Sequence, residues 1–147
     1  ILYVSGISVN SICSFYVMLS HDLHLHTGVH IVFDDIRLNE KNCYNSGDGM
    51  FVASMDGIYI FHWKITTHSG GKAGVHINKN GLSAGIVLYV KSYDEVSSRA
   101  GRVNHNSVAD FAILRLQRGD HVNIASSSEN SFIYAGHSGF GGFYLRS

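Results

Sequence analysis

Histidines are the side chains whose spacing in this sequence first suggests chemistry. His21, His24, His26 and His30 lie close together, and His24 and His26 form a His-X-His pair. Residues i and i+2 of a strand point to the same side, so such a pair can bind a metal ion with both rings. A metal-dependent enzyme would then need a nearby Glu and a second His motif with a proline turn. The chain continues Thr-Gly-Val-His and contains no proline, so we favour a solvated histidine-rich loop.

Two short motifs look functional but have a better structural interpretation. Residues 136–140 read Gly-His-Ser-Gly-Phe, which lacks the last glycine of the G-x-S-x-G nucleophile motif and its strand-to-helix context. Arg118-Gly119-Asp120 is the integrin-type tripeptide, but it lies at a predicted hairpin turn that itself favours Gly and Asp. We therefore predict no catalytic residue, no bound metal and no cofactor, and we do not expect an enzyme.

The longest polar segment, residues 91–106, is the better candidate for a ligand-binding site. It offers an aromatic ring, two carboxylates and three cationic or imidazole donors, namely Tyr93, Asp94, Glu95, Arg99, Arg102 and His105. Sugars are held by this mixture of a flat ring and fixed polar groups. Two arginines would favour an acidic sugar, because a guanidinium pairs with a carboxylate through two hydrogen bonds. The alternatives are an ordinary solvated loop, or a site on the histidine loop.

Charge and composition exclude several classes of function. The chain has 147 residues and a formal net charge of zero, whereas nucleic acids and anionic membranes require a basic surface. No apolar run approaches the ~18 residues of a membrane span. The absence of proline and of a Gly-X-Y repeat excludes a collagen stalk within this chain. We expect one globular domain over residues 1–147 that includes the apolar start.

The two cysteines leave two possibilities open. Cys13 and Cys43 form no metal-binding or redox motif. In an extracellular protein they could form a disulfide between two strand starts. Two free, buried thiols fit the sequence equally well.

The stretch from Asn45 to Ile65 predicts the central strand that the rest of the chain must cover. It begins with a Gly-Asp-Gly turn, a short apolar strand over residues 50–53 and a second turn at Asp56-Gly57. The following residues alternate with the period of two that a strand requires. One face carries Tyr59, Phe61, Trp63 and Ile65. Burial of this face stabilises the fold by several kcal/mol, at roughly 1.5–3 kcal/mol per large side chain.

The remaining strands follow from apolar segments that turn signals separate. We predict strands over residues 15–19, 31–36, 73–77, 82–90 and 108–116, with a hairpin at Asn80-Gly81 because both residues tolerate positive φ. No helical period occurs, so the sequence predicts an all-β sandwich or jelly roll. The predicted core includes Phe33, Phe51, Tyr59, Phe61, Leu114, Leu116 and Val122.

These segments together resemble the globular head of complement component 1q. The similarity rests on I-x-F-D-x-I-x-x-N over residues 31–39, G-x-Y-x-F over residues 57–61 and Lys79-Asn80-Gly81. It continues in L-x-L-x-x-G-D-x-V over residues 114–122, Tyr-Ala-Gly at 134–136 and F-x-G-x-x-L at 140–145. The resemblance is strongest over residues 15–145. Asn106 stands where relatives carry an acidic calcium ligand, so we expect calcium to be dispensable.

The resemblance implies a ten-stranded jelly-roll sandwich of the C1q/TNF-like type that assembles as a homotrimer. Members that consist of this head alone, abundant in molluscs and other invertebrates, are secreted recognition proteins of innate immunity. We therefore expect an extracellular, lectin-like pattern-recognition protein that binds glycans or microbial surface molecules. A signalling ligand of the tumour-necrosis-factor or synaptic-organiser type remains the main alternative, and a metal-dependent jelly-roll enzyme is the weaker one.

Overall fold

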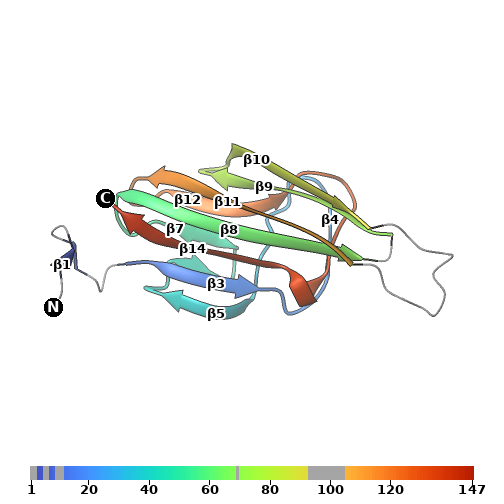
Figure 1. Cartoon of the computed structure of the whole chain (residues 1–147), viewed down its shortest axis with the longest axis horizontal. Coiled ribbons are helices and arrows are strands. Elements are labelled where there is room, and N and C mark those ends of the chain that lie inside the picture. Colours follow the sequence, from blue (N-terminus) through green and yellow to red (C-terminus); the bar gives the residue numbers. More distant parts are fainter. Residues whose placement is uncertain (1–2, 5–6, 9–11, 69, 93–104) are drawn as a thin grey trace.

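The computed structural model describes residues 3–4, 7–8, 12–68, 70–92 and 105–147. Within them, two five-stranded antiparallel sheets face each other, in agreement with the predicted ten-stranded sandwich. Figure 1 shows the strands running along the long axis of the molecule. The bounds of the elements are β1 Tyr3–Val4, β2 Ile7–Ser8, β3 Ser14–Met18, β4 Leu23–Leu25, β5 Asp35–Glu40, β6 Tyr44–Asn45, β7 Met50–Val52, β8 Gly57–His68, β9 Lys72–Lys79, β10 Leu82–Lys91, β11 His105–Leu116, β12 His121–Ser126, β13 Ser131–Ile133, the 3-10 helix η2 Ala135–His137 and β14 Gly139–Arg146.

The strand order is β11-β8-β14-β3-β5 in one sheet and β10-β9-β12-β7-β6 in the other. β4 pairs with β13, and β1 pairs with β2, in two small additional sheets. Consecutive strands often lie in different sheets, so the chain crosses repeatedly between the two layers. This arrangement brings together segments that lie far apart in the sequence.

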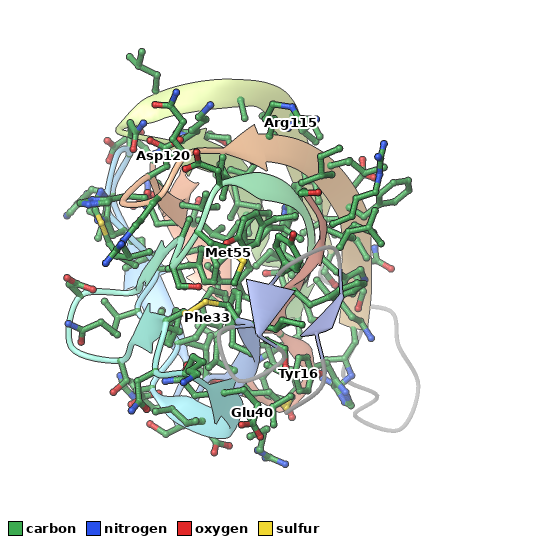
Figure 2. All side chains as sticks on the ribbon, turned by 90° about the vertical axis from the view of Figure 1, so that its left-hand side faces the viewer. Tyr16, Phe33, Glu40, Met55, Arg115 and Asp120 are labelled. Atoms are coloured by element: carbon green, nitrogen blue, oxygen red, sulfur yellow. A yellow bond between two sulfur atoms is a disulfide. The ribbon has the colours of Figure 1, made fainter. Side chains whose placement is uncertain are left out.

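Strand β8 is the central strand that the alternating pattern predicts. Tyr59, Phe61, Trp63 and Ile65 are fully buried, and β8 pairs with β11 on one side and β14 on the other. The aromatic rings of the two layers pack on one another; Phe15, for example, stacks on Phe51 with ring centroids 5.1 Å apart. Figure 2 looks along the strands and shows side chains filling the space between the sheets.

Six of the seven residues predicted for the core are buried, and the seventh is partly buried. Phe33, Phe51, Tyr59, Phe61, Leu116 and Val122 are all buried. Leu114 is partly buried and packs against this core. The Asn80-Gly81 hairpin is also confirmed, because both residues have positive φ, 52° and 82°, between β9 and β10.

The strand predicted over residues 31–36 is wrong in its position. β5 begins only at Asp35, and the preceding residues cross from one sheet to the other. Ile31 N donates to Ile124 O of β12, whereas the N–H of Phe33 donates to the hydroxyl of Tyr44 and its carbonyl accepts from that hydroxyl. A side chain thus satisfies backbone groups that a strand would have paired. The alternating burial of Ile31 and Phe33 reflects this crossing.

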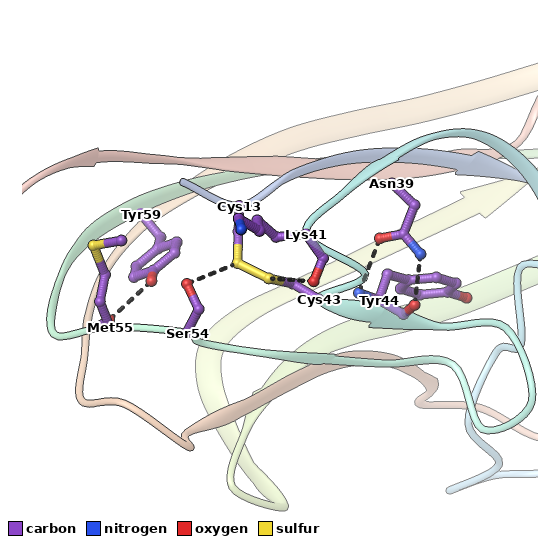
Figure 3. The surroundings of a disulfide bond; sticks show 8 residues. All are labelled: Cys13, Asn39, Lys41, Cys43, Tyr44, Ser54, Met55 and Tyr59. Atoms are coloured by element: carbon purple, nitrogen blue, oxygen red, sulfur yellow. Dashed lines mark hydrogen bonds between the residues drawn. A yellow bond between two sulfur atoms is a disulfide. The ribbon is translucent and has the colours of Figure 1, made fainter. Parts of the chain in front are cut away.

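The two cysteines form a disulfide bond between Cys13, just before β3, and Cys43, just before β6. Figure 3 shows the bond beside Ser54, whose hydroxyl lies 3.1 Å from Cys13 Sγ. Asn39 holds the neighbouring Tyr44 at both backbone groups, accepting from its N–H and donating to its carbonyl (Figure 3). Of the two possibilities that the sequence left open, the structure therefore selects the disulfide.

Candidate ligand-binding site

Most of the predicted ligand-binding loop lies outside the described residues. This applies to Tyr93, Asp94, Glu95, Arg99 and Arg102, whose role stays a prediction. The sixth predicted residue, His105, is described and begins β11 with an exposed side chain. His105 therefore marks where the predicted site meets the rest of the molecule.

Ser92 and His105, which flank residues 93–104, are both bonded near the junction of β8 and β9. On one side, Ser92 N donates to Gly71 O at 2.8 Å. On the other side, His105 pairs with His68, the last residue of β8. The β8–β9 turn consequently lies beside Ser92 and His105, the two described residues that flank this segment.

Six rings meet at this end of the sandwich. They come from four separate segments of the chain and are His24, His68, His105, Phe132, Tyr134 and His137. We call this group the ring cluster. Of these six, the sequence indicates only His24 and His105 as candidates for metal or ligand binding, since the ring contacts join segments that lie far apart in the chain.

Tyr134 is at the centre of the ring cluster. It stacks on His105, with centroids 4.8 Å apart and ring planes 13° apart, and meets the edge of His68 at 4.7 Å. His137 lies 5.9 Å from His105, and Phe132 lies 5.0 Å from His68. Imidazoles that pack against aromatic rings in this way form a surface that is both flat and able to hydrogen bond.

Thr66, a buried residue of β8, positions this part of the ring cluster. Its backbone carbonyl accepts from Tyr134 N, and its hydroxyl donates to His137 O. Its N–H donates to the hydroxyl of Ser138, which in turn donates to Tyr134 O. These contacts fix the segment that includes η2 to the end of the central strand, so Tyr134 and His137 are held by the rigid sheet.

A pocket of about 490 Å³ opens beside the ring cluster. Its wall consists of His24, His68, Gly70, Gly71, Lys72, Asn130 and Phe132. These residues come from β4, from the β8–β9 turn with the start of β9, and from the β12–β13 turn with β13. Figure 1 places β4 toward the end of the sandwich opposite the C-terminus. The pocket therefore adjoins the turn to which the predicted loop is attached.

The histidine loop is more ordered than the sequence predicted. Part of it is strand β4, in which His24 pairs with Phe132 of β13, so the prediction of a wholly loop-like segment is wrong for residues 23–25. His26 instead bonds to Glu129. In the described part of the chain, no group of three His, Cys, Asp or Glu side chains is placed to hold a metal ion.

The Arg-Gly-Asp tripeptide has the structural role that the sequence predicted. Gly119 has φ of 91°, and Asp120 accepts hydrogen bonds from Asn80 Nδ2 and Gln117 N. The amide of Arg118 donates to Asp56. Both the carboxylate and the backbone of the tripeptide are thus used to join the β11–β12 turn to neighbouring turns.

The outer face of the sheet that contains β8 is unusually apolar. Strand register aligns Phe111, His62, Gly141, Tyr16 and Leu38 in one row across it, and a second row contains Ile113, Ile60 and Phe143. Tyr16 and Phe143 are each 44% exposed, and Figure 2 shows Tyr16 on the surface. A groove of about 360 Å³ runs over this face. We call these two rows the apolar face.

Two solved structures illustrate the proteins that share this architecture. The globular domain of zebrafish complement 1qA superposes with a TM-score of 0.68 at 19% identity, over 92% of this chain and 99% of that one. Murine APRIL superposes with a TM-score of 0.66 at 11% identity, over 91% of this chain and 99% of that one. At these identities the similarity defines the fold, which is the jelly-roll sandwich of C1q and TNF domains.

The family itself follows from the sequence comparison. The C1q domain model matches residues 14–145, and the chain belongs to the C1q domain family. The mouse complement C1q tumor necrosis factor-related protein 2 is 34% identical over 110 residues, which is 71% of this chain and 32% of that protein. The chain thus spans about a third of the length of this relative. No helix in the described residues has the length and apolarity that a membrane span requires.

Proposed function

We propose that this chain is a secreted, lectin-like pattern-recognition protein that binds carbohydrate or microbial surface molecules and is not an enzyme. Its membership of the C1q domain family supports a role as a recognition or signalling ligand. The observation that favours sugar binding is the ring cluster with its adjoining pocket, beside the attachment points of residues 93–104. Flat rings and fixed polar groups at one exposed end are what a sugar requires.

Secretion is supported by the disulfide between Cys13 and Cys43. Disulfides persist in oxidising compartments and are rare in the cytosol. Reduction of this bond should lower the melting temperature, because the bond links the residue before β3 in one sheet to the residue before β6 in the other.

Assembly as a homotrimer is part of the proposal. A ring requires two different surfaces on each copy. The apolar face is one of them, and the edge strand β10, with Val87 61% and Tyr89 56% exposed, is the other. We propose that β10 of one copy packs on the apolar face of the next. Several weak sugar sites on one assembly would raise avidity by roughly 10²–10⁴.

The second candidate is a signalling ligand that engages a protein receptor. The similarity to the C1q tumor necrosis factor-related protein and to APRIL favours it. Binding to intact cells separates the two functions. A lectin loses binding after glycosidase treatment of the cells, whereas a receptor ligand loses binding after protease treatment and keeps it after removal of glycans.

The predicted loop is tested within the same assay. Arg99→Ala and Arg102→Ala, made singly, should weaken binding to a glycan on which the protein depends, because their guanidinium groups are the expected donors. Folding and oligomer size serve as controls. If both variants keep full binding, the sugar site does not include these arginines.

A further inference from the structure

The pocket beside the ring cluster has an unbalanced set of polar groups. Its described wall includes Lys72, His24, His68 and Asn130, but no Asp or Glu residue. A concave surface that combines a lysine with neutral hydrogen-bond donors attracts negatively charged ligands. The chain as a whole is neutral, so this imbalance is local.

Two acids on described neighbouring segments, Asp22 and Glu129, are engaged outside the pocket wall. Glu129 accepts from His26 Nδ1 at 3.0 Å and from Thr27 N at 3.2 Å. Asp22 accepts from Ala135 N at 2.8 Å. Among the described residues, no ion pair occupies the Lys72 amine. Within the described part of the chain, the amine therefore has no competing carboxylate partner.

Phe132 provides the apolar part of the same pocket. Its ring is held between two imidazoles in edge contacts, with His24 at 6.1 Å and 74° and His68 at 5.0 Å and 87°. A ring fixed in this way offers a surface to the C–H groups of a sugar. The pocket volume of about 490 Å³ lies within the roughly 300–1,000 Å³ of small-molecule sites.

We infer that this pocket binds an acidic monosaccharide unit of a glycan, with its sulfate or carboxylate on Lys72 and His24 and its ring against Phe132. The inference rests on the proposed function and names the ligand class and the site for it. Every group that it assigns to ligand contact lies in the described part of the chain.

Titration of the purified, assembled protein with three sugars tests this inference. Galactose 6-sulfate and galacturonic acid represent the two possible anionic groups, and galactose is the uncharged reference. Lys72→Gln removes the charge and nearly preserves the size. Lys41→Gln is the matched control, since Lys41 is an exposed lysine in the turn between β5 and β6. Phe132→Leu removes the flat ring.

We expect at least one acidic sugar to bind roughly tenfold more tightly than galactose, the effect of one charge-assisted hydrogen bond. Lys72→Gln should abolish that preference, and Lys41→Gln should behave as wild type. Phe132→Leu should weaken binding of all three sugars. Equal affinity for the three sugars, or a preference that survives in Lys72→Gln, would overturn the inference.

A glycan array with the same proteins distinguishes a wrong assignment of the pocket from a wrong assignment of the lectin function. If wild type and Lys72→Gln bind the same glycans equally well, the pocket is not the site, while the lectin function stands. If wild type binds no glycan on the array, the inference and the proposed function both fail.

Discussion

Tyr134 and His105 stack with their ring planes 13° apart, although β12 and β13 lie between them in the chain. This contact joins the start of β11, where the predicted loop ends, to the segment that Thr66 holds in place. It therefore connects the rigid sheet to the part of the chain for which the sequence predicts ligand binding.

Removal of this contact should weaken glycan binding without unfolding the protein. Tyr134→Ala takes away the ring against which His105 stacks, so His105 loses its fixed orientation. We expect at least a severalfold loss of affinity for an array-identified glycan, with an unchanged circular-dichroism spectrum. Tyr134→Phe keeps the ring and should retain binding, and an equal loss in both variants would contradict a role for stacking.

Phe61→Ala should destabilise the fold by about 3–5 kcal/mol, which is the range for emptying a buried aromatic site. Phe61 is fully buried and contacts the rings of Phe51 and Phe140. Urea unfolding at fixed protein concentration measures this change. Lys41→Ala is the control, because Lys41 is exposed in the β5–β6 turn, away from both proposed contact surfaces, and its truncation should change the free energy of unfolding by less than about 0.5 kcal/mol.

Charged residues at either proposed contact surface should dissociate the trimer. Phe143→Asp alters the apolar face and Tyr89→Asp alters the edge strand β10, so light scattering should show each variant as a monomer. Mixing the two variants should produce a dimer, because each retains the surface that the other lacks. A wild-type monomer at micromolar concentration would contradict the assembly.

Acid should remove a stabilising contribution of Asp120. Its hydrogen bonds, first of all that from Asn80, lower the pKa of this carboxyl below the ordinary value of 3.8. The folded state therefore favours the ionised form, and the contribution is present above pH 3.8 and is lost as the pH falls through the lower, folded-state pKa. Asp120→Asn should lower the melting temperature at neutral pH, and this difference should narrow in strong acid. A difference in melting temperature that grows on acidification would contradict the predicted contribution of ionised Asp120.

Calcium should be dispensable for stability. Asn106, at the position where the resemblance places an acidic calcium ligand in relatives, donates through its side-chain amide to Lys91 O at 2.6 Å, whereas calcium binds through several oxygen ligands. The melting temperature should be the same with excess calcium and with chelator. A calcium-dependent rise that chelator abolishes would show that other residues form a site.

The sequence predicted the parts of the fold that local patterns encode. The alternation in β8 and the Asn80-Gly81 turn each need only neighbouring residues, and both predictions are confirmed. The strand predicted at Ile31 is wrong because the hydroxyl of Tyr44 satisfies the backbone of Phe33, and no local pattern indicates such a partner.

The candidate site was less accessible to prediction for the same reason. His24 pairs with Phe132 across more than a hundred residues, and His68 reaches the cluster only because β8 ends there. A polar stretch and a set of histidines identified His105 and His24 as candidates. Their ring partners follow from the topology of the sandwich, which local spacing does not determine.

A glycan array, probed with the wild-type protein in calcium and again in chelator, tests the central claim most directly. We predict binding to a restricted set of glycans in which acidic sugars predominate, with the same pattern in both conditions. Absence of binding to every glycan, together with saturable binding to a protein on the surface of deglycosylated cells, would contradict the lectin assignment and establish a receptor ligand instead.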